Sequence, residues 1–303
     1  MVKKIFNILF LFLISVSLYG AFDSKVMMNQ GLEAFRSGNY SSAELLFRRT
    51  VEFNDENRDK AWFYLARSIY QQGKYSAALF EFNTFLTKCR TEALRIESRF
   101  WIGESYFNLK QNLKAIEEYK RFLENSKDKI LVVTAHDRIA AIYYNQQRYE
   151  EAVIEWENAI SKSEDREKNA VLILKIGQAF FANGEFEKAQ ERLYPLITSR
   201  IDSRSKTEIR ITLGQIYQHQ GDHRKALTTF NGIPKELAAK YPYYNMYYFR
   251  ALSYLDLGRN ASAKADLELF YMIGKESQYY YDAVFELGKL LLDTYKTDNG
   301  LDL

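Results

Sequence analysis

The sequence is poor in the residues that cross-link or kink a chain. It has one cysteine, three prolines and three histidines among 303 residues. The single thiol, Cys89, can form no internal disulfide, so stability must come from packing. Charge of one sign is not in excess either, because 42 basic and 39 acidic residues give a net charge of +3. This balance excludes the strongly basic surface of a nucleic-acid-binding protein.

Motifs that would carry chemistry are also missing. His136, His219 and His223 fall in no metal-ligand or nucleophile pattern, and Gly221 interrupts the helix that would align the last two for a metal. The sequence contains no phosphate-binding glycine loop, zinc-protease motif or serine elbow. We therefore predict a protein that is not an enzyme and that uses no metal or cofactor.

Residues 1–20 have the pattern of a secretory signal peptide. Lys3 and Lys4 precede an apolar run over residues 5–18, and Gly20 supplies a small residue before a cleavage site. The run is short for a membrane span, although an uncleaved anchor is the alternative because the cleavage site is mediocre. No cysteine follows the run, so we expect no lipid anchor, and membrane contact only through a partner or an uncleaved leader. The prediction is an exported, periplasmic protein that is soluble after removal of the signal peptide.

Two series of small residues recur at a nearly fixed interval. After a first gap of 35, every gap in both series is 37 residues. Two phased series at one period indicate stacked helical hairpins, each of which buries its apolar face against its neighbours. Two helices approach to about 8 Å only where no bulky side chain stands between them, so these residues should mark helix crossings. The series are Gly31, Ala66, Gly103, Ala140, Gly177, Gly214, Ala251 and Gly288, and Ala43, Ala78, Ala115, Ala152, Ala189, Ala226 and Ala263.

Large apolar residues and turn residues keep the same period. We expect the large residues, four positions after each alanine of the second series, to fill the flanks of the crossings. Between the two helices of a pair stands a glycine, or Lys110 and Gln147 in two repeats, where a left-handed backbone is cheap only for glycine. The large residues are Phe47, Phe82, Tyr119, Trp156, Leu193, Phe230 and Leu267, and the turn glycines are Gly38, Gly73, Gly184, Gly221 and Gly258.

This pattern resembles the tetratricopeptide repeat (TPR) family over residues 24–295. One repeat matches the family's offsets with Trp62, Leu65, Ala66, Gly73, Tyr75 and Ala78. The resemblance implies an all-α fold, in which antiparallel helix pairs stack into a right-handed α-solenoid whose inner surface grips peptides. It implies a superhelix over residues 21–295, with seven repeats starting near 24, 59, 96, 133, 170, 207 and 244. A capping helix from about 281 and a disordered tail over residues 296–303 complete the expected organisation.

The repeats also depart from the usual family pattern. They have 37 residues where the family usually has 34, so we expect longer second helices. Pro195, and Gly232 with Pro234, should kink or end the second helices of the fifth and sixth repeats. The spacing is similar to that of bacterial envelope members, such as the Tol-Pal-associated division coordinator and the outer-membrane assembly lipoprotein. The chain lacks the coiled coil of the former and the lipidated cysteine of the latter.

The family resemblance implies a concave groove formed by the first helices. Tyr70, Phe107, Tyr144 and Phe181 form a ladder at intervals of 37 that could contact the apolar anchors of a partner. The alternative is that these rings pack between adjacent first helices. The predicted groove residues are Phe63, Tyr70, Phe100, Phe107, Tyr144, Leu174 and Phe181.

A tyrosine-rich stretch near the C-terminal end is a second candidate surface. Its rings suit a protein or an envelope sugar, and packing of the last repeats is the alternative use. The candidate residues are Tyr243, Tyr244, Tyr247 and Tyr248. Together these features predict a non-enzymatic scaffold or adaptor that binds protein partners of the bacterial cell envelope. The alternatives are an accessory subunit of an envelope enzyme, or of a transport system that delivers a small ligand.

Overall fold

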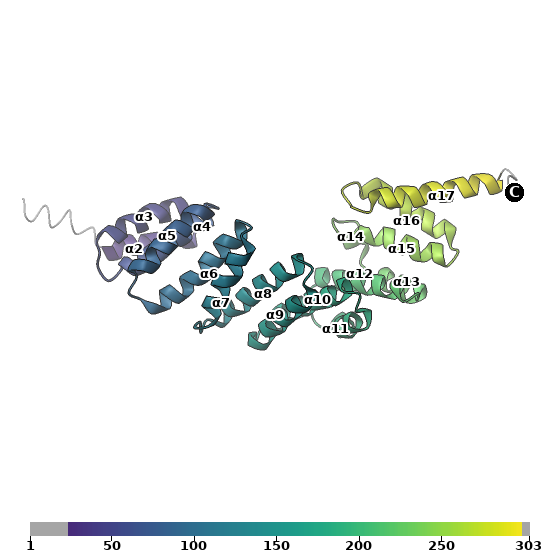
Figure 1. Ribbon diagram of the computed structural model, residues 1–303. Coiled ribbons are helices and arrows are strands. Elements are labelled where there is room, and N and C mark those ends of the chain that lie inside the picture. The colour runs from purple at the N-terminus through teal and green to yellow at the C-terminus, as the bar shows by residue number, and fades with distance from the viewer. Residues whose placement is uncertain (1–23, 299–303) are drawn as a thin grey trace, which may run out of the picture. The chain divides into compact units, whose positions relative to one another are not determined.

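The computed structural model describes residues 24–298 (Figure 1). The prediction of an all-α fold is confirmed, because this part of the chain forms helices and turns but no strand. It divides into two compact units, of which unit 1 ends at Ile139 and unit 2 begins at Ala140. The boundary falls within helix α8, Lys129–Asn145. The predicted signal peptide, residues 1–20, lies outside the described residues.

Unit 1 consists of three helix pairs and the first part of α8. Adjacent first helices touch, α2 against α4 and α4 against α6. The pairs are α2 (Ser24–Arg36) with α3 (Tyr40–Glu52), α4 (Arg58–Gln71) with α5 (Tyr75–Lys88), and α6 (Glu92–Asn108) with α7 (Asn112–Leu123).

Unit 2 continues the same pairing after the rest of α8. Its first helices again touch their neighbours, α10 against α12 and α12 against α15. The elements are α9 (Tyr149–Lys162), α10 (Arg166–Ala182), α11 (Phe186–Thr198), α12 (Ser203–His219), α13 (His223–Asn231), the short α14 (Lys235–Ala238), α15 (Asn245–Asp256), α16 (Asn260–Ile273) and α17 (Tyr280–Asp298).

The small residues lie at the helix crossings, as predicted. A Cβ added to Gly214 would come within 2.4 Å of the Phe230 ring, and one added to Gly103 within 2.8 Å of the Tyr119 ring. Every alanine of the second series is fully buried. The large residue of each second helix therefore lies directly over the small residue of the first helix, so that any larger side chain there would separate the pair.

The turns between paired helices have the predicted left-handed backbone. The five turn glycines have φ between 67° and 79°. Lys110 and Gln147 adopt φ of 60° at the equivalent positions. The turn geometry therefore persists where glycine is absent, at the cost of local strain in two repeats.

The additional residues of the 37-residue repeat lie in the first helices, so the expectation of longer second helices is wrong. Helices α6, α8, α10 and α12 each have 17 residues, whereas α7, α9, α11 and α13 have 12, 14, 13 and 9. Three aspartates spaced 37 apart, Asp128, Asp165 and Asp202, begin α8, α10 and α12. Each carboxylate accepts backbone N–H groups two and three residues later. The helices consequently start about four residues before the predicted repeat starts.

Prolines and glycines shape the ends of two second helices. Pro195 lies inside α11, which ends three residues later at Thr198. Gly232 follows the last residue of α13, and α14 begins directly after Pro234. The capping helix α17 starts within one residue of the expected position. It continues through Lys296 to Asp298, so the predicted disordered tail cannot begin at residue 296.

Candidate functional site

The ladder residues of unit 1 pack against the next first helix. The Tyr70 ring centre lies 5.2 Å from that of Trp101, and the Tyr70 hydroxyl donates a hydrogen bond to Glu104. The Arg138 guanidinium lies 5.1 Å from the centre of the Phe107 ring. Both rings are half-buried. The alternative that the ladder serves packing between repeats therefore describes these two residues well.

The ladder residues of unit 2 have different neighbours. Tyr144 contacts Tyr149 and Trp156 of its own helix pair. Phe181 contacts Phe186 and His219, and the His219 ring stacks on Phe186 at 4.8 Å. Both ladder rings are half-buried.

Three predicted groove residues lie in the core, so their assignment to a binding surface is wrong. Phe63 is 1% exposed, and Phe100 and Leu174 are each 3% exposed. Phe63 packs on Phe82 and Phe85 of the second helix of its own pair. Each of these residues lies three positions before a small residue of the first series, so about one helical turn places it on the same buried face as the helix crossing.

Most of the tyrosine-rich patch is also buried. Tyr243, Tyr244 and Tyr247 are 9%, 4% and 8% exposed, so they cannot form an open contact surface. Tyr248 is half-buried and stacks on Tyr279 with ring centres 5.4 Å apart. The packing alternative is thus correct for three of the four residues.

Two adjoining cavities form a groove along the first helices of unit 2. They have volumes of about 510 Å³ and 340 Å³ and share Gln215, Phe249 and Tyr279. We call them together the unit 2 groove. Helices α10, α12, α15 and α17 supply most of its lining, which includes the predicted residues Phe181, Tyr243 and Tyr248. The other lining residues are Gln178, Glu208, Ile211, Thr212, Gln218, His219, His223, Pro242, Asn245, Leu252, Asp256, Gln278 and Asp282.

The unit 2 groove is acidic and rich in amides. Its lining includes three carboxylates and two histidines but neither lysine nor arginine. Burial, together with a hydrogen bond to Glu208, raises the pKa of Tyr243 to about 12. Burial and the nearby Asp282 carboxylate likewise raise the pKa of Tyr248. Both phenols therefore stay neutral at physiological pH, and the single O–H of Tyr243 is already donated to Glu208.

Two buried polar atoms of the groove have no hydrogen-bond partner. They are Nδ1 of His223 and Oδ1 of Asn245. The His223 nitrogen lies 3.3 Å from a carboxylate oxygen of Asp256 but not in hydrogen-bonding geometry. Buried polar groups are nearly always paired in native proteins, so these two atoms mark a part of the groove where hydrogen bonding within the described residues is incomplete.

The amide of Gln218 is fixed between two first helices. Its Nε2 donates to the Phe249 carbonyl at 2.6 Å and to the Ser253 hydroxyl at 2.8 Å. Gln218 occupies the next ladder position after Phe181. At this position the groove has an amide side chain in place of an aromatic ring. The sequence signal for the groove lies one residue after each small residue, where Gln178, Gln215 and Leu252 recur at intervals of 37.

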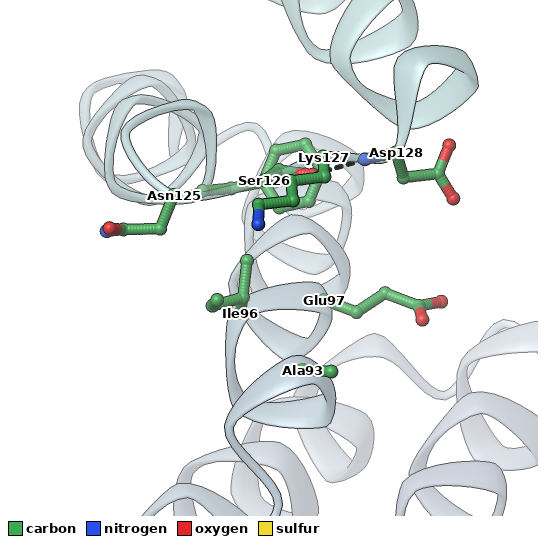
Figure 2. Close-up of a pocket in the computed structure, with 8 residues that line it drawn as sticks. Ala93, Ile96, Glu97, Asn125, Ser126, Lys127 and Asp128 are labelled. Atoms are coloured by element: carbon green, nitrogen blue, oxygen red, sulfur yellow. Dashed lines mark hydrogen bonds between the residues drawn. The ribbon is translucent and has the colours of Figure 1, made fainter.

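A cavity of about 370 Å³ in unit 1 is a weaker candidate. Figure 2 shows it between Ala93, Ile96 and Glu97 of α6 and the loop before α8. The loop's polar groups already have structural uses, because the Ser126 hydroxyl accepts the Asp128 N–H and Asp128 begins α8. Glu97 accepts the Trp101 indole N–H at 3.3 Å. This cavity therefore offers few free groups for a ligand.

The one cysteine is unsuited to nucleophilic chemistry. Cys89 is buried, and its thiol donates to the Asp59 carboxylate at 3.3 Å. Burial and this neighbouring carboxylate raise the pKa of Cys89 to about 11, against the opposing effect of the Thr91 N–H. The thiol therefore stays protonated at neutral pH.

Between residues 24 and 298 no three His, Cys, Asp or Glu side chains cluster as metal ligands would. No helix in this range combines the length and apolar character that crossing a bilayer requires.

The fold has many solved counterparts. The C-terminal part of a TPR repeat-containing protein from Cytophaga hutchinsonii is 15% identical, with a TM-score of 0.66 over 84% of this chain and 98% of that one. The apo form of RapI is 13% identical, with a TM-score of 0.69 over 91% and 86%. YrrB, a TPR protein with an unusual peptide-binding site, is 16% identical, with a TM-score of 0.50 over 68% and 96%. At these identities the likeness shows the fold alone.

Comparison with known sequences gives the family. A search of curated proteins gave no match. Residues 28–88, 97–128 and 244–273 match tetratricopeptide repeats. The matched segments lie in both units and coincide with helix pairs whose crossings and turns have the geometry described above. The chain accordingly contains tetratricopeptide repeats in both units.

Proposed function

We propose that this protein is a non-enzymatic scaffold that holds a partner protein of the bacterial cell envelope, and that the partner binds in the unit 2 groove. The observation that carries the proposal is the groove lining, which combines three carboxylates and several amides with two buried, unpaired polar atoms. A peptide backbone supplies both donors and acceptors for such groups.

The electrostatics favour a peptide with lysine or arginine side chains. Asp256 and Asp282 can pair with a cationic group. The stacked rings of Tyr248 and Tyr279 lie beside them and offer a face for a cation. YrrB, which shares the fold, has a peptide-binding site according to its description, and this supports a peptide as the ligand here.

The proposed location depends on residues 1–20. Their basic start and short apolar run support export to the periplasm with loss of the leader. Mass spectrometry of the protein purified from a bacterial periplasm tests this directly. A chain that begins near Ala21 is expected, and a full-length chain in the membrane fraction would contradict it.

Peptide binding tests the groove. We would use labelled extended peptides that differ only in carrying arginine or glutamate at alternate positions, with fluorescence anisotropy as the measurement. The arginine peptide should bind and the glutamate peptide should not. The variant Asp256→Lys should weaken arginine-peptide binding about tenfold or more, because it places a like charge in the groove.

A matched control separates the groove from net charge. Glu187 is an exposed carboxylate on α11, outside the groove lining. Glu187→Lys changes the net charge by the same amount and should leave the affinity unchanged. Equal binding of both peptides, or equal effects of the two variants, would contradict the proposed site.

Crosslinking in cells identifies the partner. A photoreactive amino acid at position 248 should capture an envelope protein, because Tyr248 lines the groove. The same probe at position 107, on the ladder of unit 1, is the control, and it should capture less. The reverse result would move the binding surface to unit 1.

A further inference from the structure

Helix α17 is the last described helix of unit 2 (Figure 1). It carries a stripe of exposed apolar side chains. The stripe residues are spaced by 4, 3, 4 and 3 positions, which is the spacing of a coiled-coil seam. The opposite face is buried in unit 2 through Ala283, Leu287 and Leu290. The stripe consists of Tyr281 (82% exposed), Phe285 (66%), Gly288, Leu292 (53%) and Tyr295 (61%).

Gly288 lies at the centre of this stripe and is the last member of the small-residue series. In four earlier pairs the equivalent glycine lies under a large side chain of the second helix, Phe230 over Gly214 for example. At Gly288 no described atom lies within 4 Å of an added Cβ. Helix α17 therefore has a helix-crossing point that no helix of the described residues occupies.

We propose that a second copy of α17 occupies this crossing point, in an antiparallel pair centred on Gly288. The stripe has similar residues on the two sides of Gly288. On each side a large apolar residue, Phe285 or Leu292, comes first, and a tyrosine follows farther out. In such a pair Tyr281 lies beside Tyr295 of the second copy, and Phe285 lies beside Leu292. A stripe of this kind fits the two-fold symmetry of a homodimer, in which each surface meets its own copy.

The charges that flank the stripe fit the same pairing. Asp282 and Lys296 directly follow Tyr281 and Tyr295, so the antiparallel pair brings each Asp282 next to Lys296 of the second copy. Lys289, which lies near the centre, is already paired with Glu286 of its own helix at 2.9 Å. The dimer would thus gain two ion pairs without leaving an uncompensated charge at its centre.

The exposed area is sufficient for a dimer. An aromatic side chain offers about 150–250 Å² of surface, so the stripe and Leu291 (44% exposed) together expose roughly 600 Å² per copy. Burying this area on both copies gives roughly 1,200 Å², which is at the lower end of specific interfaces.

Sedimentation equilibrium of the purified protein tests the proposal. A dimer is expected, and Phe285→Asp should raise its dissociation constant about a hundredfold, because it buries a charge beside Leu292 of the second copy. Leu113→Asp is the matched control, since Leu113 is 77% exposed on α7 of unit 1. It should leave the dissociation constant unchanged. Circular dichroism should be the same for both variants, because both side chains are exposed.

A charge exchange tests the antiparallel register. Lys296→Asp should weaken the dimer about tenfold, and adding Asp282→Lys should restore it. Because Asp282 also lines the unit 2 groove, the readout is mass and not peptide binding. A monomer at every concentration, or a dimer that Phe285→Asp leaves intact, would overturn the proposal. A double variant that stays weak would rule out the antiparallel pairing.

Discussion

The inner faces of the two units differ at one repeated position. This position directly follows each small residue of the first helices and recurs every 37 residues. In unit 1 it is occupied by Leu32, Arg67 and Glu104, and in unit 2 by Ala141, Gln178, Gln215, Leu252 and Lys289. Unit 1 thus has two charged side chains in successive repeats where the middle repeats of unit 2 have two amides and a leucine.

Unit 1 fills its inner face with the two charged side chains. The Arg67 guanidinium lies 4.4 Å from the Trp101 ring and 5.1 Å from the Phe35 ring. Burial lowers the pKa of Arg67, against the attraction of Glu97, but arginine stays charged at any physiological pH. The cation is therefore held mainly by aromatic faces.

Glu104 is the centre of a buried hydrogen-bond network in unit 1. Its carboxylate accepts hydrogen bonds from the Tyr119 hydroxyl at 2.6 Å, from Arg138 Nε at 2.8 Å and from the Tyr70 hydroxyl at 3.1 Å. Burial and this carboxylate raise the pKa of both tyrosines. One side chain thus joins three successive first helices, α4, α6 and α8.

Unit 2 leaves the same position open. Gln178, Gln215 and Leu252 all line the unit 2 groove, so the space that neighbouring side chains fill in unit 1 remains accessible. The inner face is thus closed around Glu104, whose charge is paired with Arg138 and two tyrosines, and it is accessible at the amides of Gln178 and Gln215. The helix pairs beneath are built alike.

The largest expected effect comes from removing the carboxylate of unit 1. Glu104→Ala should lower the free energy of unfolding by about 3 kcal/mol, because it leaves Arg138 and two buried hydroxyls without their acceptor. Gln215→Ala at the equivalent position of unit 2 should change it by less than about 0.5 kcal/mol. Urea unfolding followed by circular dichroism measures both. Similar losses would show that the inner face of unit 2 is as tightly packed as that of unit 1.

The helix pairs, their crossings and their turns could be predicted from sequence because each of these features has one geometric cause. A glycine under Tyr119 or Phe230 has no room for a Cβ, and a turn residue at φ near 60° favours glycine. The helix starts were predictable too, from Asp128, Asp165 and Asp202, but small residues alone do not locate them. The small residues do locate the buried face, and residues three positions before them belong to that face.

The candidate site was predictable only in part. Phe181 of the predicted ladder and Tyr248 of the separate tyrosine-rich stretch line the same groove, whereas Phe63, Phe100 and Leu174 are buried in the core. Whether an inner position is filled depends on residues 31 to 38 positions away, such as Trp101 and Asn108 around Tyr70. Periodicity within one repeat carries no information about those contacts.

Enlarging the crossing glycines should affect both units alike. Gly103→Ala in unit 1 and Gly214→Ala in unit 2 should each cost about 1–3 kcal/mol of stability, because the new Cβ would meet the ring of Tyr119 or Phe230. Gly288→Ala in the Phe285→Asp background, where the proposed dimer does not form, is the control, and it should stabilise the helix by about 1 kcal/mol, since nothing described in the same copy lies near its Cβ. Denaturant midpoints measure all three. A neutral result at Gly103 and Gly214 would contradict the helix-crossing assignment.

Acid should weaken unit 1 through Asp59. Burial opposes ionisation of this carboxyl, but hydrogen bonds from Arg58, the Arg90 N–H, Cys89 and Thr91 outweigh it and lower the pKa from 3.8 to about 2. The depressed pKa contributes about 2 kcal/mol above pH 3.8, which is lost as the pH falls towards 2.

The matched variant for this titration is Asp59→Asn. The difference in unfolding free energy between wild type and variant should be constant above pH 4 and shrink towards pH 2. Fluorescence of Trp62 and Trp101 reports on unit 1, and that of Trp156 reports on unit 2. A difference that does not change with pH would mean that the Asp59 pKa is not depressed.

The smallest expected effect concerns the turns, where the units should not differ. Lys110 in unit 1 and Gln147 in unit 2 both hold φ of 60° without being glycine. Lys110→Gly and Gln147→Gly should each relieve this strain and raise the unfolding free energy by about 0.5–1 kcal/mol. Gly73→Ala and Gly221→Ala are the reverse substitutions at φ of 75° and should lower it by a similar amount. These substitutions leave the side chains of the inner faces unchanged. Equal gains would therefore mean that the two units differ in the side chains of their first helices and not in their turns. A gain in only one unit would mean that turn strain also distinguishes them.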